Sequence, residues 1–235
     1  KYNCRGCHNV EGKGGDIQKY LKAKAQYPPP LEMGEYHVGE RLKSSWLYSF
    51  LRNPTPVRTW IKVKMPTFAF SDKEVQDLTS YFEAMSPGAE YEAGINKAKD
   101  NAVAQKGAEM VTYMDCGRCH DDGQKGIEFS LASQRLRQDW IPKWLKDTRA
   151  MIPWTPMPSH WVKDGEGYKV PTKYDEINSV GDVDTQVGTL KDLIVAYNTA
   201  ELDFDASLGE GGDEEEGDEE GGEEGGDDEE EEDDE

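Results

Sequence analysis

The chain has 235 residues, of which 48 are acidic and 27 basic, and its formal net charge is −21. The acidic excess lies at the C-terminal end, because residues 209–235 contain only glycine, aspartate and glutamate. No basic stripe and no long apolar run exists, which argues against nucleic-acid binding and against a membrane span. No signal peptide is recognisable, and a chain that begins at Lys1 rather than Met is expected to be a processed or trimmed product.

Two copies of one short motif contain all four cysteines of the chain. They are Cys4-Arg5-Gly6-Cys7-His8 and Cys116-Gly117-Arg118-Cys119-His120. A C-x-x-C-H motif is typical of covalent haem attachment, because its two thiols can add to the two vinyl groups of a haem while the adjacent histidine reaches the iron. We therefore expect two c-type haems, held by Cys4, Cys7, Cys116 and Cys119, with His8 and His120 as iron ligands.

Three other interpretations of the motif are weaker. A structural zinc site needs ligand clusters that pair within one small unit, and each pentapeptide offers only three ligands. A thioredoxin-like redox pair lacks its βαβ context in this chain. Local disulfides within each motif leave the repeated histidine unexplained.

The segment after the first motif resembles the segment after the second. Apolar residues at helical spacing predict a helix over 41–52, and residues 135–146 repeat its arginine, leucine and tryptophan positions. A proline-containing loop with the sequence Met65-Pro66 follows the first block, and a similar loop with Met157-Pro158 follows the second. The chain thus contains two copies of one unit.

Further helices complete each unit. Ser71 begins a capping box that leads into an amphipathic helix, and a second amphipathic helix starts near Asp184. A polar, Lys- and Ala-rich linker over 87–100 joins the units. A helix precedes the second motif, with its apolar positions at Val103, Gly107, Met110, Val111 and Met114. The residues between His160 and Gly181 are an insertion in the second unit, expected to form a surface loop or a small hairpin.

Each unit resembles a small class I cytochrome c domain: C-x-x-C-H, a middle helix, a Met-Pro loop and a C-terminal helix. The resemblance implies an all-α fold of two tandem helical domains, each around one covalent haem. We expect domain 1 over 1–86, a linker over 87–100, domain 2 over 101–202 and a disordered acidic tail over 203–235. The first unit departs from the family, because only three residues precede Cys4 where a leading helix is expected. Either upstream residues were removed or another segment supplies that packing.

The resemblance implies Met65 and Met157 as the sixth ligands of the two irons. A thioether favours ferrous iron and raises the potential relative to a second histidine. Alternatives remain: His160 lies close enough to replace Met157, His37 completes the number needed for two bis-histidine haems, and Met151 is the nearest rival methionine. For both histidines an ordinary surface or hydrogen-bonding role is the favoured interpretation.

The resemblance also implies residues around each haem. A backbone carbonyl from residues 29–31 is expected to accept the Nδ1 proton of His8, and a carbonyl near Phe129 to do the same for His120. Contacts to the haem propionates are expected from four residues, for which ordinary helix packing is an equal alternative. These residues are Arg41, Arg135, Trp60 and Trp154.

These features predict a protein that relays single electrons between a donor complex and an acceptor in a respiratory or photosynthetic chain, rather than an enzyme. The alternatives are a dihaem peroxidase-like enzyme and a haem-based ligand sensor with an open iron site in domain 2. Thioether-bound haem places the chain in the periplasm or on the outer face of a membrane. The expected partners are redox proteins that are subunits of a membrane-associated electron-transfer complex, and the acidic tail is expected to attract a basic partner.

Overall fold

The computed structural model describes residues 1–33, 35–86, 101–121 and 125–197. The predicted linker and acidic tail lie outside these residues. The part before the gap, hereafter repeat 1, contains α1 (Cys4–Cys7), α2 (Val38–Arg41), α3 (Ser44–Arg52) and α4 (Asp72–Ala84), with 3₁₀ turns at Asp16–Tyr20 and Lys24–Gln26. The part after the gap, repeat 2, contains α5 (Asn101–Tyr113), α6 (Gly117–His120), α7 (Phe129–Arg135), α8 (Trp140–Lys146), α9 (Thr148–Met151), a 3₁₀ segment at Thr172–Val180, and α10 (Val183–Ala196).

Helices dominate the described residues, which fits the all-α prediction. Three two-stranded antiparallel ladders are added to them: β1 (Asn9–Val10) with β2 (Lys13–Gly14), β3 (Glu32–Met33) with β4 (Tyr36–His37), and β5 (Val162–Asp164) with β6 (Gly167–Lys169). The last pair is the small hairpin expected in the insertion of repeat 2. No helix among the described residues has both the length and the apolar character of a membrane span.

The helix expected over 41–52 is interrupted, and this part of the prediction is wrong. α2 ends at Arg41 and α3 begins at Ser44, so Leu42 lies in extended backbone between them. The same break occurs in repeat 2, where α7 ends at Arg135 and α8 begins at Trp140. The reason is tertiary, because the two breaks pair with each other across an antiparallel bridge between Leu42 and Leu136.

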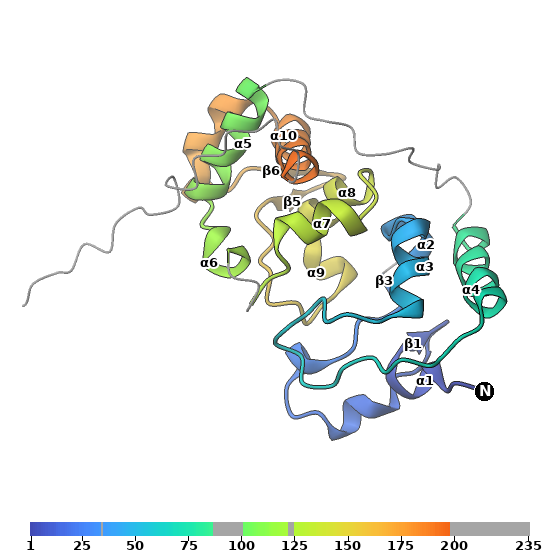
Figure 1. Ribbon diagram of the computed structural model, residues 1–235. Coiled ribbons are helices and arrows are strands. Elements are labelled where there is room, and N and C mark those ends of the chain that lie inside the picture. The colour runs from blue at the N-terminus through green and yellow to red at the C-terminus, as the bar shows by residue number, and fades with distance from the viewer. Residues whose placement is uncertain (34, 87–100, 122–124, 198–235) are drawn as a thin grey trace, which may run out of the picture.

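The two repeats contact each other with approximate two-fold symmetry around this bridge. The backbone N–H of Lys43 donates to the carbonyl of Arg135, and that of Arg137 donates to the carbonyl of Arg41, both at 2.9 Å. The side chains repeat the exchange: Lys43 Nζ lies 3.1 Å from the carbonyl of Ser133, and Arg137 Nε lies 2.6 Å from that of Gly39. In Figure 1, α7 lies next to α2 and α3.

An apolar cluster, hereafter the interface cluster, extends this contact. Its buried members are Met33 from repeat 1 and Trp140, Met151 and Ile152 from repeat 2. The ring of Tyr36 packs edge-on against Trp140 at 5.4 Å between centroids. The two predicted tandem units are therefore in direct contact in the structure.

The C-terminal helix of each repeat begins with the expected cap. The Ser71 hydroxyl accepts the backbone N–H of Glu74, while the Glu74 carboxylate accepts the backbone N–H of Ser71 at 2.9 Å. In α10 the Asp182 carboxylate accepts the N–H of Thr185 at 2.8 Å. Each cap satisfies backbone donors that a helix start leaves without partners.

Repeat 2 contains the predicted leading helix, and α5 packs along α10 (Figure 1). Gly107 permits the close approach, because a Cβ atom at that position would lie 2.9 Å from the Cβ of Leu193. Met110 and Met114 are buried in the same cluster, as expected for packing residues. Repeat 2 thus has a core of its own around α10.

Candidate haem-binding sites

The two cysteine motifs each occupy a short turn of helix, α1 in repeat 1 and α6 in repeat 2. None of the four cysteines, all of which are described, is in a disulfide. Cys4 and Cys119 are exposed, and Cys7 and Cys116 are partly buried. Burial raises the pKa of the Cys116 thiol to about 12, so this thiol stays protonated at neutral pH.

His8 is oriented by the backbone of the loop that follows it. Its Nδ1 lies 2.8 Å from the carbonyl of Pro29, within the segment where the sequence predicted such an acceptor. Burial lowers the pKa of His8, the bond to Pro29 opposes this, and the charges of Arg41 and Arg58 lower it further. The imidazole is therefore neutral, with Nδ1 as the donor and Nε2 left for an iron ligand bond.

His120 is held in the same way in repeat 2. Its Nδ1 lies 2.7 Å from the carbonyl of Ile127, close to the position expected near Phe129. The ring also stacks on Phe129 at 4.8 Å between centroids. Gly126 lies against this ring, since a Cβ atom there would come within 2.9 Å of His120 Nδ1. Two different loops thus produce the same ring orientation.

The two methionines expected as sixth ligands lie in loops in the structure. Met65 is partly buried and packs against the core of repeat 1. Met157 is partly buried too, and its sulfur accepts a hydrogen bond from Nε1 of Trp144 at 3.1 Å. A thioether sulfur has a second lone pair, so this bond leaves one for a metal. Iron ligation by Met65 and Met157 stays a prediction.

The rival ligands have other partners. His160 is 7% exposed, and its Nδ1 lies 3.1 Å from the hydroxyl of Tyr174. Met151 is buried in the interface cluster. His37 ends β4 and its backbone N–H donates to the Glu40 carboxylate at 3.0 Å. The contacts of His160 and His37 agree with the hydrogen-bonding role that the sequence favoured for them, and Met151 is a packing residue in the structure.

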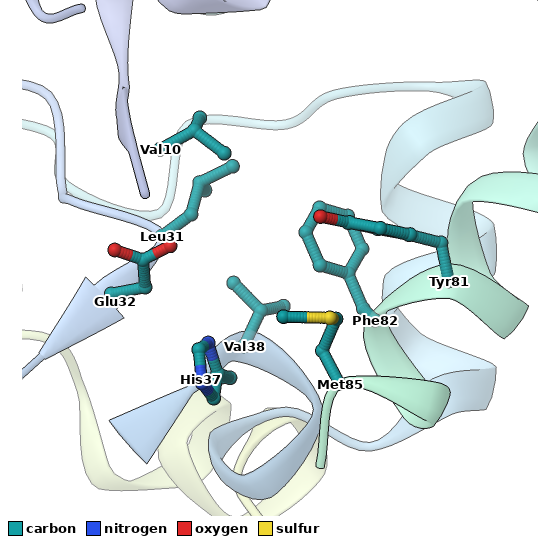
Figure 2. A pocket seen from close by; sticks show the side chains of 8 residues that line it. All are labelled: Val10, Leu31, Glu32, His37, Val38, Tyr81, Phe82 and Met85. Atoms are coloured by element: carbon teal, nitrogen blue, oxygen red, sulfur yellow. The ribbon is translucent and has the colours of Figure 1, made fainter. Parts of the chain in front are cut away.

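Figure 2 shows the cavity next to His37. It lies between Leu31 and Glu32 on one side and, on the other, Tyr81 and Phe82 of α4 and Met85 directly after that helix. Its volume is about 10 Å³. A space of that size holds no more than one water molecule. This cavity is therefore not a haem site.

The arginines expected near the propionates are more than nine-tenths buried. Arg41 is 7% exposed and Arg135 is 8% exposed, and the Nε atom of each has no hydrogen-bond partner. Trp60 and Trp154 are partly buried; the carbonyl of Trp60 accepts from Gln26 at 2.9 Å, and the ring of Trp154 packs edge-on against Tyr27. These contacts of Trp60 and Trp154 fit ordinary packing as well as haem binding.

These observations fit a haem in each repeat. Both histidines have a fixed tautomer with Nε2 available, and two buried arginines have donors without an acceptor, as carboxylate ligands would require. The zinc alternative finds no support, because no group of three or more His, Cys, Asp or Glu converges within the described ranges.

Sequence reasoning missed two residues near these sites. Arg58 lies in the loop after α3, and its charge contributes to the lowered pKa of His8 and of Arg41. Its signal in the sequence was weak, since repeat 2 has no arginine at the matching place before its tryptophan. Trp144 lies within the block 135–146, and its bond to Met157 depends on how α8 faces the Met-Pro loop.

Comparison with known proteins finds a family match for repeat 1. Residues 1–86 match the protein family described as Cytochrome c, and the match ends before the second motif. Searches of curated proteins and of solved structures found no significant match to the chain. Such domains are typically electron carriers and commonly extracytoplasmic. The match over residues 1–86 therefore supports a c-type cytochrome with covalently bound haem and suggests haem-based electron transfer.

Proposed function

We propose that the chain carries two covalently bound c-type haems, one in each repeat, and relays single electrons between a donor and an acceptor protein. The observation that carries this proposal is the repeated histidine geometry. Each C-x-x-C-H histidine donates its Nδ1 proton to a backbone carbonyl, at 2.8 Å for His8 and 2.7 Å for His120. Two loops of different sequence and length produce this arrangement, so chance repetition of the motif is a poor explanation for it.

The chain's residues orient the metal and set its potential. A bound haem supplies an iron that exchanges one electron reversibly. The carbonyls of Pro29 and Ile127 fix the two imidazole rings and increase their donation through Nε2. Met65 and Met157 are the proposed sixth ligands, and the Trp144 indole holds the Met157 side chain in place. No bond is made or broken in a substrate: the donor protein loses one electron and the acceptor protein gains it.

The same proposal includes the cellular setting. Haem attachment through the thioethers of all four cysteines favours a location in the periplasm or on the outer face of a membrane. The proposed partner is a membrane-associated redox complex. The acidic tail, 209–235, would attract a basic partner surface over about one Debye length, roughly 8 Å at physiological salt.

An open iron site in repeat 2 is the alternative that a peroxidase-like enzyme or a ligand sensor requires. It depends on the sixth ligand of that iron, for which Met157 is proposed here and His160, bonded through Nδ1 to Tyr174, is the rival. The ferric absorption spectrum separates the two cases through the weak sulfur-to-iron charge-transfer band at the far-red edge. Band intensity for two haems supports the relay. Intensity for one haem points to repeat 2, where His160 would be the ligand or the iron site would be open.

The haem count tests the proposal directly. We expect two covalent haems per chain by pyridine haemochrome assay and by intact mass. A Cys4→Ser and Cys7→Ser double variant should retain one haem, and so should a Cys116→Ser and Cys119→Ser double variant. A parent protein with only one haem, lost in one double variant and kept in the other, would contradict a haem in each repeat.

A further inference from the structure

Three arginines without an acidic partner lie between the two repeats. They are Arg41 at the end of α2, Arg135 at the end of α7, and the partly buried Arg58 in the loop after α3. Among the described residues no carboxylate pairs with any of them, and the Nε atoms of Arg41 and Arg135 have no acceptor. A buried, unpaired cation is costly, so this arrangement calls for an anion that the described residues do not supply.

The three charges are close enough to repel one another. Burial lowers the pKa of Arg41 to about 9, and the charge of Arg58 adds to this. Burial also lowers the pKa of Arg58 to about 10. For Arg135 burial again has the largest effect, and both other arginines lower its pKa further. The charge of Arg58 thus acts on both other arginines, and the charge of Arg41 acts on Arg135.

Both repeats build this site. The guanidinium of Arg135, from repeat 2, lies over the ring of Trp46, from repeat 1, at 5.7 Å from its centroid. The carbonyl of Arg41 is bonded to the backbone of Arg137, and the carbonyl of Arg135 to the backbone of Lys43. The approximate two-fold symmetry of the bridge thus brings equivalent arginines of the two repeats together. Arg58 has no equivalent in repeat 2 and adds a third charge from repeat 1.

We propose that Arg41, Arg58 and Arg135 form one anion site that is shared by the propionates of both haems. The inference rests on the proposed function, because it needs a haem in each repeat. Each haem carries propionate carboxylates, which are acceptors that match the free guanidinium donors. A shared site means that each arginine acts on both irons, so the loss of one positive charge displaces both midpoint potentials.

The test is a redox titration of the full-length holoprotein and of Arg135→Gln. A positive charge near an iron favours the reduced state, so its removal from a shared site lowers both midpoint potentials. Arg149→Gln is the matched control, since Arg149 is an exposed arginine of the same repeat, and it should displace neither midpoint. The conservative variant Arg135→Lys keeps the charge and should return both midpoints towards the parent values.

Arg58→Gln is a second, independent variant, because Arg58 is only partly buried and its loss endangers folding less. It too should lower both midpoints. Haem content is measured first in every protein. A parent with fewer than two haems overturns both proposals, whereas two haems with only one midpoint displaced, by Arg58→Gln or Arg135→Gln, overturns the shared site alone.

Discussion

The two repeats share a motif order but differ in how they close their cores. In repeat 2, α10 packs against α5, α7 and α8, and Leu193 on it is fully buried. In repeat 1, α4 packs against α2 and α3, and Tyr81 on it is 42% exposed. The pairing of α5 with α10 has no counterpart among the described residues of repeat 1. Repeat 2 therefore has the more complete interior.

Repeat 1 instead shares apolar contacts with its neighbour. Leu136 of repeat 2 packs against the buried cluster of repeat 1 as well as against the interface cluster and the core of repeat 2. Met33 of repeat 1 is buried in the interface cluster. The difference indicates that repeat 2 acts as the scaffold and that the contact between repeats is part of the core of repeat 1.

The largest effect is expected at the interface cluster. Trp140 is 2% exposed, and Trp140→Ala should lower the free energy of unfolding by about 4 kcal/mol through lost burial and a cavity. Trp46 occupies the equivalent place in repeat 1 but is only partly buried and stacks on Phe50. Trp46→Ala should therefore cost about 2 kcal/mol. Chemical denaturation of the holoproteins measures both, and equal losses would contradict the unequal roles assigned to the repeats.

A somewhat smaller effect separates the two C-terminal helices. Leu193 and Phe82 occupy the same position relative to the caps Asp182 and Ser71. Leu193 is fully buried beneath α5, so Leu193→Ala should cost about 3 kcal/mol. Phe82 is partly buried, and Phe82→Ala should cost about half as much despite its larger side chain. The same denaturation experiment decides, and a larger loss for Phe82→Ala would show that α4 is as well packed as α10.

Local signals in the sequence predicted much of this architecture. The Ser71 capping box and the helix before the second motif depend on residues near one another in the chain, and the structure contains both. The backbone acceptors for His8 and His120 were implied by the resemblance to cytochrome c domains, and the structure has one for each histidine. The hairpins β1–β2 and β3–β4 were not predicted, because two-residue strands are too short to show a period.

What the sequence did not predict depends on contacts between distant segments. The breaks at Leu42 and Leu136 have apolar spacing that fits a helix, and only their pairing with each other explains the extended backbone. The cluster formed by Arg41, Arg58 and Arg135 is likewise a product of that pairing. Tertiary contacts of this kind override helical propensity and leave no local pattern.

The smallest expected effect is the pH dependence of stability that the carboxylates at the two helix caps cause. Hydrogen bonds from Lys1, Ser71 and Tyr2 hold the pKa of Glu74 at about 2, below its ordinary value of 4.5. Because the folded state has the lower pKa, this stabilisation is complete above pH 4.5 and is lost as the pH falls towards 2. In repeat 2 the hydroxyl and backbone N–H of Thr185 lower the pKa of Asp182, which has the same sign of effect.

Unfolding free energies at about pH 5 and about pH 3 separate the two caps. Glu74→Gln should reduce the loss of stability on acidification. Adding Asp182→Asn to this variant should reduce the loss further, because Asp182 contributes independently from the other repeat. Asp77→Asn is the matched control: it removes an exposed carboxylate of α4 that pairs with Lys73 and takes no part in a cap. If Asp77→Asn flattened the pH dependence as much as Glu74→Gln does, total charge rather than the capping box would be its cause. An unchanged slope in Glu74→Gln would instead place the acid sensitivity of the protein outside α4.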